Sequence, residues 1–196
     1  MTEFGWLDER PIVVAIAGSN GAGKTTFYQA HLADCGLRYV NADILAEQLD
    51  LEPYVAARMA GALRRGLLQR GESFVFETVF SDPVGDELAL LSDAVEADYR
   101  AVLCFVGIAA AEISKQRVAM RVSQGGHDVP ADKIRTRFAR TLENLRRAIA
   151  ELPHVLVFDN EDLAHPYRLV ATFESGSMVQ ASDPLPDWLR DALPRS

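Results

Sequence analysis

The sequence has few cysteines, no long apolar run and no excess of positive charge. Only Cys35 and Cys104 occur, far apart in the chain, so we expect buried thiols and neither a disulfide nor a metal site. No uninterrupted apolar stretch approaches the roughly 20 residues that a membrane-spanning helix needs. The first residues include an acid and lack the basic segment of a leader peptide, so we expect a cytoplasmic protein.

The net charge is −8, which argues against a nucleic-acid-binding surface. The positive charges are nevertheless concentrated, because residues 115–147, here called the basic segment, contain nine basic residues and three acids. Such a segment could neutralise phosphate during group transfer, or it could be a pair of helices with solvated arginines. A length of 196 residues fits a single domain, residues 1–196, with the basic segment as a small helical lid.

The most specific motif follows the first apolar run, Ile12–Ala17, which reads as a buried strand. After it the chain matches the pattern G-x-x-x-x-G-K-[ST], in which glycines let successive backbone N–H groups converge on phosphate oxygens. The lysine then reaches the β- and γ-phosphates, and the next hydroxyl can ligate Mg²⁺. The sequence therefore predicts a nucleoside triphosphate site with Thr25 as the metal ligand. This phosphate loop comprises Gly18, Ser19, Asn20, Gly21, Ala22, Gly23, Lys24, Thr25 and Thr26.

Short apolar runs alternate with helical patterns along the chain. Strands are expected near residues 12–17, 38–40, 73–77, 100–107 and 155–158, with helices between them. This alternation is typical of a parallel, doubly wound sheet flanked by helices, the α/β fold of P-loop NTPases and kinases. Ligands of such sheets bind at the carboxyl ends of the strands.

Several boundaries of the expected elements rest on glycine and proline. The first helix is expected to run from Thr25 to Asp34, and Pro83 is expected to open the helix after the third strand. The pair Gly125-Gly126 is expected to form a hinge between the two helices of the lid. From Tyr167 the chain is expected to form a C-terminal β-hairpin, followed by a short helix carrying Trp188.

A carboxylate, Asp43, stands directly after the second expected strand, at the same sheet edge as the phosphate loop. In that place it can accept the proton of an attacking hydroxyl or hold the water shell of a metal. It can equally be a helix N-cap, because Ala-Asp-Ile-Leu-Ala-Glu begins a helix and aspartate is a preferred cap. The residues alone leave both interpretations open.

A second carboxylate, Glu77, closes the third strand and is followed by Thr78. An acid directly after strand residues is costly to bury unless it meets a metal, a substrate hydroxyl or a partner, so we expect one of the first two. The nearest match to a Walker B motif elsewhere is Phe158-Asp159-Asn160, for which we expect a role beside the nucleobase or in a turn. The histidines show no metal-binding spacing, and His127 is the one that could be functional.

Several of these segments, taken in order, resemble the zeta toxin family of phosphotransferases. They are the phosphate loop, Asn41–Asp43, Phe76–Thr78, the run from Arg117 to Pro130, Ile134–Asn144 and Phe158–Asn160. The resemblance implies a kinase that moves the γ-phosphate of ATP or GTP to a hydroxyl of a small molecule. In the best-known branch of the family this hydroxyl is on the sugar of UDP-N-acetylglucosamine. It also implies an antitoxin protein as a possible partner.

The resemblance also implies roles for individual residues. Asp43 would be the general base, and Lys24 and Thr25 would act on the phosphates and Mg²⁺. Arg121, together with Arg135 or Arg137, would clamp the transferred group. The acceptor would be contacted by Asn41, Glu77, Thr78 and His127.

One segment departs from the family pattern. Where relatives commonly read Glu-Thr-Thr-Leu-Ser, this chain has Val79 and Phe80 after Glu77-Thr78, which replaces a hydroxyl and adds an aromatic ring. The acceptor is therefore left open. Two alternatives stand beside the sugar-nucleotide kinase: a metabolite kinase with a different acceptor, and a nucleotide-dependent regulatory ATPase or switch that binds partners.

Overall fold

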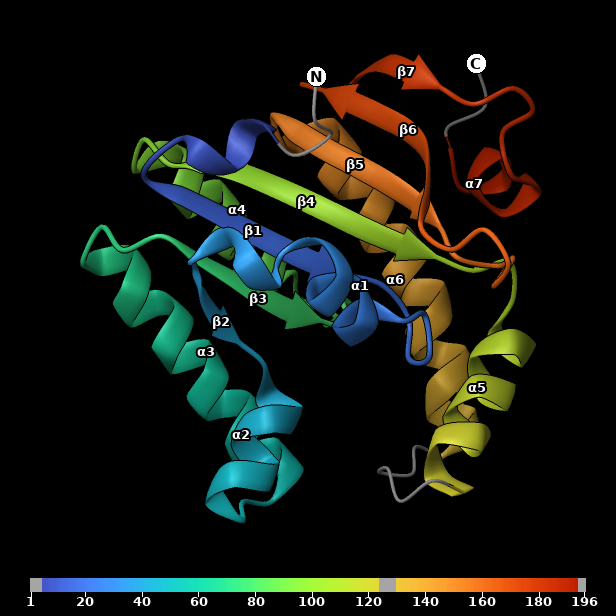
Figure 1. Cartoon of the computed structure of the whole chain (residues 1–196), viewed down its shortest axis with the longest axis horizontal. Coiled ribbons are helices and arrows are strands. Elements are labelled where there is room, and N and C mark those ends of the chain that lie inside the picture. The colour runs from blue at the N-terminus through green and yellow to red at the C-terminus, as the bar shows by residue number, and fades with distance from the viewer. Residues whose placement is uncertain (1–4, 124–129, 194–196) are drawn as a thin grey trace.

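The structure is a computed structural model that describes residues 5–123 and 130–193. Its described strands form one seven-stranded sheet in the order β2-β3-β1-β4-β5-β6-β7 (Figure 1). The strands are β1 (Ile12–Ala17), β2 (Arg38–Val40), β3 (Phe74–Thr78), β4 (Arg100–Gly107), β5 (His154–Asp159), β6 (Arg168–Glu174) and β7 (Ser177–Ala181). The helices are α1 (Lys24–His31), α2 (Ala42–Leu49), α3 (Pro53–Gln69), α4 (Asp86–Glu96), α5 (Ala111–Ser123), α6 (Ala131–Glu151) and α7 (Asp187–Ala192), with short 3₁₀ helices η1 (Gly5–Asp8) and η2 (Ala33–Cys35).

The first five strands are parallel, and the last two are antiparallel to their neighbours. All six residues of β1 are buried, as expected for a central parallel strand that is covered on both faces. This confirms the predicted α/β fold. The C-terminal hairpin of β6 and β7 is also confirmed, and it extends the same sheet, because β6 pairs with β5.

Two apolar cores lie on opposite faces of the sheet. One packs the sheet against residues of α3, α4, α6 and α7, and the other packs it against α1 and the chain around η1. Figure 1 shows α1 in front of β1, with α6 passing behind β4 and β5. The sheet therefore holds the loops at its carboxyl edge between two helical layers.

Two helix boundaries differ from those expected. The helix α4 begins at Asp86 and not at Pro83, because the Asp82 carboxylate accepts hydrogen bonds from the backbone N–H of Gly85 and of Asp86. Gly85 has a left-handed φ of 87°, which makes residues 83–85 a turn. The helix α1 ends at His31 and is followed by η2, so the expected single helix to Asp34 is in fact two short ones.

The expected hinge at Gly125-Gly126 lies outside the described residues. Among the helices of the described residues, none combines the length and apolar character needed to cross a bilayer.

Candidate active site

The phosphate loop connects β1 to α1, and its glycines are required by close contacts. A Cβ on Gly18 would lie 2.2 Å from the Val106 carbonyl oxygen, and one on Gly23 would lie 2.6 Å from Asn160 Nδ2. Gly18, Gly21 and Gly23 all have positive φ values, of 147°, 73° and 97°. Because Gly23 precedes α1 and has no side chain to cap it, the first N–H groups of this helix can receive an anion.

Side chains from distant parts of the chain brace the loop from behind. Asn160 Nδ2 donates to the Ala22 carbonyl at 2.7 Å, the Tyr167 hydroxyl donates to the Gly23 carbonyl at 3.0 Å, and Ser114 Oγ donates to the Asn20 carbonyl. Asp159, beside Asn160, accepts a hydrogen bond from the Trp188 indole at 2.9 Å. The Asp159-Asn160 pair, expected beside the nucleobase or in a turn, therefore links the loop to the end of β5.

The cation and hydroxyl of the loop face a carboxylate on the neighbouring strand. Lys24 Nζ donates to the Ser19 carbonyl at 3.1 Å and lies 3.8 Å from Glu77 Oε1. The Thr25 hydroxyl donates to Glu77 Oε2 at 2.9 Å. β3 is hydrogen-bonded beside β1, so Glu77 comes to the loop by strand register. The structure thus joins Glu77 to the two loop residues that were assigned to phosphate and metal.

Two further donors reach the same oxygen of Glu77. The Tyr39 hydroxyl donates to Glu77 Oε2 at 2.7 Å, and Asn41 Nδ2 donates to it at 3.0 Å. The Tyr39 ring is stacked on Tyr28 of α1, with centroids 3.6 Å apart. Burial and the adjacent Glu77 raise the pKa of the Tyr39 phenol well above its usual range, so it remains a donor. Sequence reasoning missed Tyr39, because a tyrosine in a short strand has no distinctive motif.

The oxygen groups at this point fit Mg²⁺. Since the Thr25 hydroxyl gives its proton to Glu77, its lone pairs are left for a cation, and oxygen ligands are those that Mg²⁺ prefers. Within residues 5–123 and 130–193, no group of three or more histidines, cysteines or acids could hold a metal ion.

The start of α2 distinguishes Asn41 from Asp43. The Asn41 side-chain oxygen accepts from the backbone N–H of Asp43 at 2.8 Å and of Ile44 at 3.4 Å, so Asn41 is the N-cap of α2. The capping interpretation of Asp43 is therefore wrong. Asp43 is exposed in the first helical turn, and its role as a base stays a prediction.

Thr78, which is predicted to contact the acceptor, belongs to a second polar network. Its hydroxyl donates to Glu87 Oε1 at 3.1 Å and accepts from the Phe80 backbone N–H at 3.0 Å. Burial and the neighbouring Asp82 raise the pKa of Glu87 to about 8. A substrate hydroxyl at Thr78 would have to use the remaining lone pair of this oxygen.

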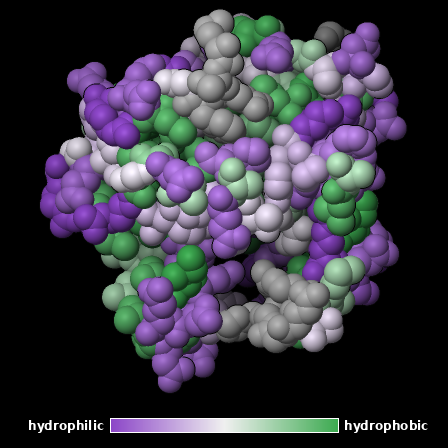
Figure 2. Space-filling view, viewed as in Figure 1, coloured by the Kyte–Doolittle hydropathy of each residue, from purple (hydrophilic) through white to green (hydrophobic). Residues whose placement is uncertain are grey.

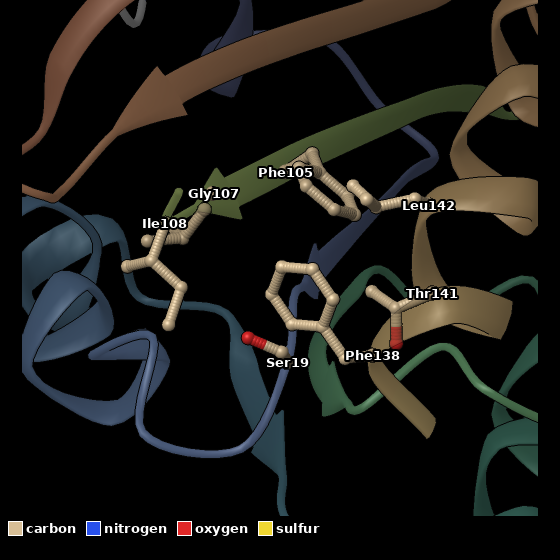
Figure 3. Close-up of a pocket in the computed structure, with 8 residues that line it drawn as sticks. Ser19, Phe105, Gly107, Ile108, Phe138, Thr141 and Leu142 are labelled. Atoms are coloured by element: carbon tan, nitrogen blue, oxygen red, sulfur yellow. The ribbon is translucent and has the colours of Figure 1, made fainter. Parts of the chain in front are cut away.

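The helix α6 fixes the loop that follows Thr78. Thr141 Oγ1 donates to the Val79 carbonyl at 2.9 Å, and Asn144 Nδ2 donates to the Phe80 and Asp82 carbonyls at 3.0 and 3.1 Å. Figure 3 shows the Phe138 ring of α6 beside Ser19 of the phosphate loop, and both line a small hollow at the end of β4. The helix α6 is thus hydrogen-bonded to the loop after Thr78 and lies next to the phosphate loop.

The arginines of the basic segment differ in position. Arg135 is exposed and pairs with Glu112 of α5 at 3.0 Å. Arg137 is half-buried and lies on the helix face of Ile134 and Thr141, which is the face that packs inwards. Arg121 lies in α5, but its side chain is outside the described part of the structure, as is all of His127.

The α2–α3 hairpin and α6 approach each other across a hollow. Lys133 Nζ donates to the Tyr54 hydroxyl at 3.3 Å, which joins the start of α6 to the start of α3. Figure 2 shows a hollow on this face, beside the lobe formed by α2 and α3. Substrates of such a fold bind at the carboxyl edge of the sheet, and α2 follows β2 at that edge.

Solved structures with the same architecture were found, although their sequence identity is low. A chain of the AvrRxo1-ORF1:-ORF2 complex with ATP has a TM-score of 0.69 at 18% identity, covering 90% of this chain and 62% of its own length. A chain of the PezAT toxin-antitoxin system of Streptococcus pneumoniae has a TM-score of 0.61 at 16% identity, covering 94% and 77%. A putative kinase from Chloroflexus aurantiacus has a TM-score of 0.51 at 18% identity, covering 66% and 78%.

These likenesses show that the chain has the fold of a kinase-like P-loop domain. The chain spans 63% and 62% of the length of two AvrRxo1-ORF1:-ORF2 chains that it matches. The comparison with curated proteins found no match. A profile of the AAA domain family matches residues 13–147, which include the phosphate loop, Glu77 and most of α6. Because this match covers more than half of the sequence, the chain belongs to the AAA domain family.

Proposed function

We propose that this protein is a phosphotransferase that moves the γ-phosphate of a nucleoside triphosphate to a hydroxyl of a small molecule. The observation that carries the proposal is the contact of Glu77 with Lys24 and Thr25 at the sheet edge where α2 presents Asp43. A phosphate loop alone binds a nucleotide, whereas a transferase also needs a carboxylate base beside an acceptor hollow. ATP is the favoured donor, since one structural neighbour was solved with ATP, and GTP is the alternative.

The residues divide into a donor and an acceptor group. Lys24 and the loop N–H groups bind the phosphates, while Thr25, whose hydroxyl donates to Glu77, would hold Mg²⁺, which supplies charge neutralisation on the phosphates when bound. Asp43 accepts the proton of the attacking hydroxyl. Arg121 and Arg137 clamp the transferred group, and Arg137 is preferred to Arg135, because Arg135 is exposed and paired with Glu112.

The acceptor we propose to test first is UDP-N-acetylglucosamine, with contacts from Asn41, Thr78 and His127. Support for it comes from the sequence resemblance to zeta toxins, together with the PezAT toxin-antitoxin chain among the structural neighbours. An antitoxin partner and a cytoplasmic location belong to the same proposal. The competing acceptor class is another hydroxylated metabolite, because Val79 and Phe80 change the segment after Thr78.

The experiment is to incubate the purified protein with Mg-ATP and a metabolite extract, and to search by mass spectrometry for a compound that gains one phosphate. A parallel reaction contains UDP-N-acetylglucosamine alone. We expect one acceptor to be phosphorylated and ADP release to rise with its concentration. ATP hydrolysis that no acceptor accelerates would support the regulatory ATPase or switch and would contradict the kinase.

A further inference from the structure

We propose that Tyr39 is a positioning residue of this site: its hydroxyl holds the Glu77 carboxylate so that Thr25 presents its lone pairs to the metal. The inference rests on the proposed function and adds a residue from β2 to the parts of the site. It starts from three hydrogen bonds to Glu77 Oε2, which come from Thr25 at 2.9 Å, Tyr39 at 2.7 Å and Asn41 at 3.0 Å.

The direction of each proton in this network is fixed. Asn41 Nδ2 donates to the Tyr39 oxygen at 3.0 Å as well as to Glu77, so the single Tyr39 proton must point to Glu77. The Thr25 hydroxyl likewise has one proton and gives it to Glu77. The lone pairs of Thr25 are therefore directed away from the carboxylate, where a cation can take one of them.

The two carboxylate oxygens of Glu77 have separate tasks. Oε2 receives the three donors, while Oε1 lies 3.8 Å from Lys24 Nζ. Without the Tyr39 bond the carboxylate would keep two donors on Oε2 and could rotate about its last torsion, which is broad for glutamate. Thr25 would then lose its fixed acceptor, and its hydroxyl would sample orientations that do not suit the metal.

The position of Tyr39 makes it suited to this task. Its ring is stacked on Tyr28, with an interplanar angle of 5°, and Tyr28 lies on α1 one turn after Thr25. A change to phenylalanine keeps this stack and removes only the hydroxyl. The burial of Tyr39 and its raised pKa keep the hydroxyl protonated at any ordinary pH.

The test is the Mg²⁺ dependence of nucleotide binding. A fluorescent ATP analogue is titrated into wild type and Tyr39→Phe at a series of Mg²⁺ concentrations, and separately in EDTA. We expect Tyr39→Phe to raise the half-saturating Mg²⁺ concentration about fivefold or more, since it removes a hydrogen bond to a charged group, and to leave the affinity in EDTA within about twofold. Tyr28→Phe is the matched control, which should leave both quantities unchanged.

A double-mutant cycle separates this role from a general effect on packing. In a Glu77→Gln background, Tyr39→Phe should change the Mg²⁺ dependence no further, because Tyr39 acts through Glu77. Wild-type Mg²⁺ dependence in Tyr39→Phe, an equal loss of affinity with and without the metal, or additive effects in the cycle would each overturn the inference and leave the proposed function intact. Failure of the wild-type protein to bind the analogue would overturn both.

Discussion

The proposed donor and acceptor sides of the site are built differently. On the donor side, Ser114 of α5, Asn160 directly after β5 and Tyr167 directly before β6 hold the phosphate loop from behind. Lys24 and Thr25 face a carboxylate that has several donors. On the acceptor side, Asp43 is exposed, and α2 and α3 present exposed apolar side chains at Leu49, Tyr54, Val55 and Met59.

This difference separates two requirements of group transfer. Phosphates need backbone donors in fixed positions before the nucleotide arrives, because electrostatic stabilisation is strongest in a preorganised site. A site that admits an acceptor must open, so its side chains remain exposed. The contact between α6 and α3 at this place is one exposed hydrogen bond, from Lys133 Nζ to the Tyr54 hydroxyl.

The largest effect is expected on the donor side, from Lys24→Ala. This change removes the cation of the loop while the glycine backbone stays intact, so phosphotransfer should fall by about 10³-fold or more and triphosphate affinity should fall with it. Rates of ADP release and binding of a fluorescent ATP analogue measure both. Phosphotransfer close to wild type would show that the loop is not the catalytic site.

The two lid arginines should differ sharply. Arg137→Ala should lower turnover by about 10³-fold, because this half-buried side chain lies on the inward face of α6 and is assigned to the transferred phosphate. Arg135→Ala should lower it by less than about threefold, since an exposed ion pair contributes little. Steady-state kinetics of the two variants, with Arg140→Ala as a further exposed control, decide the matter. Equal and mild effects would refute the clamp.

At the start of α2, the proposed base Asp43 should affect activity, whereas the helix cap Asn41 should affect stability. Asp43→Asn should lower turnover by about 10²-fold to 10³-fold, and keep stability within about 0.5 kcal/mol, because an amide cannot take the acceptor's proton and Asn41 is the cap.

Asn41→Ala should instead lower the stability by about 1 kcal/mol or more through loss of the cap. Chemical denaturation gives the stabilities and phosphotransfer assays give the turnover. A fully active Asp43→Asn protein would leave the proposed mechanism without a base.

The smallest effect concerns Glu87, beneath the acceptor-side loop. Its pKa of about 8 in the folded protein lies above the ordinary value of 4.5, so the folded state retains a proton that the unfolded state loses. The stability from this group is fully present below about pH 4.5 and is lost as the pH rises through 8. Glu87→Gln lacks this loss and can still accept from Thr78.

Thermal unfolding at pH 6 and pH 9 checks this expectation. The difference in Tm between Glu87→Gln and wild type should be a few degrees larger, in favour of the variant, at pH 9 than at pH 6. A shift of that size corresponds to about one to two kcal/mol of stability in a chain of this size. The groups that face Glu87 are Asp82, Thr78 and Arg64, and all three are kept in this variant. A Tm difference that does not change with pH would show that Glu87 is ionised in the folded protein.

Local pattern was enough to predict the elements and the phosphate loop. The run Ile12–Ala17 is apolar throughout, and the loop needs glycines at fixed spacing because their positive φ values and close contacts exclude a Cβ. Glu77 was also found, since an acid at the end of an apolar strand is conspicuous. The start of α4 was missed. The hydrogen bonds from the backbone of Gly85 and Asp86 to the Asp82 carboxylate place the first helical residue three positions after Pro83.

Local sequence is sufficient to predict the strands, the phosphate loop and the kind of residues that follow each strand, because strand alternation and glycine spacing act over a few residues. Which of these residues meet depends on the three-dimensional fold. Thr25 and Glu77 are 52 residues apart, Thr141 and Val79 are 62 apart, and Asn160 and Ala22 are 138 apart. The first and third pairs form because the parallel register brings the carboxyl ends of β1, β3 and β5 to one edge, and a register is a property of the whole sheet that no local pattern contains. The second pair forms because α6 packs against the loop that follows β3.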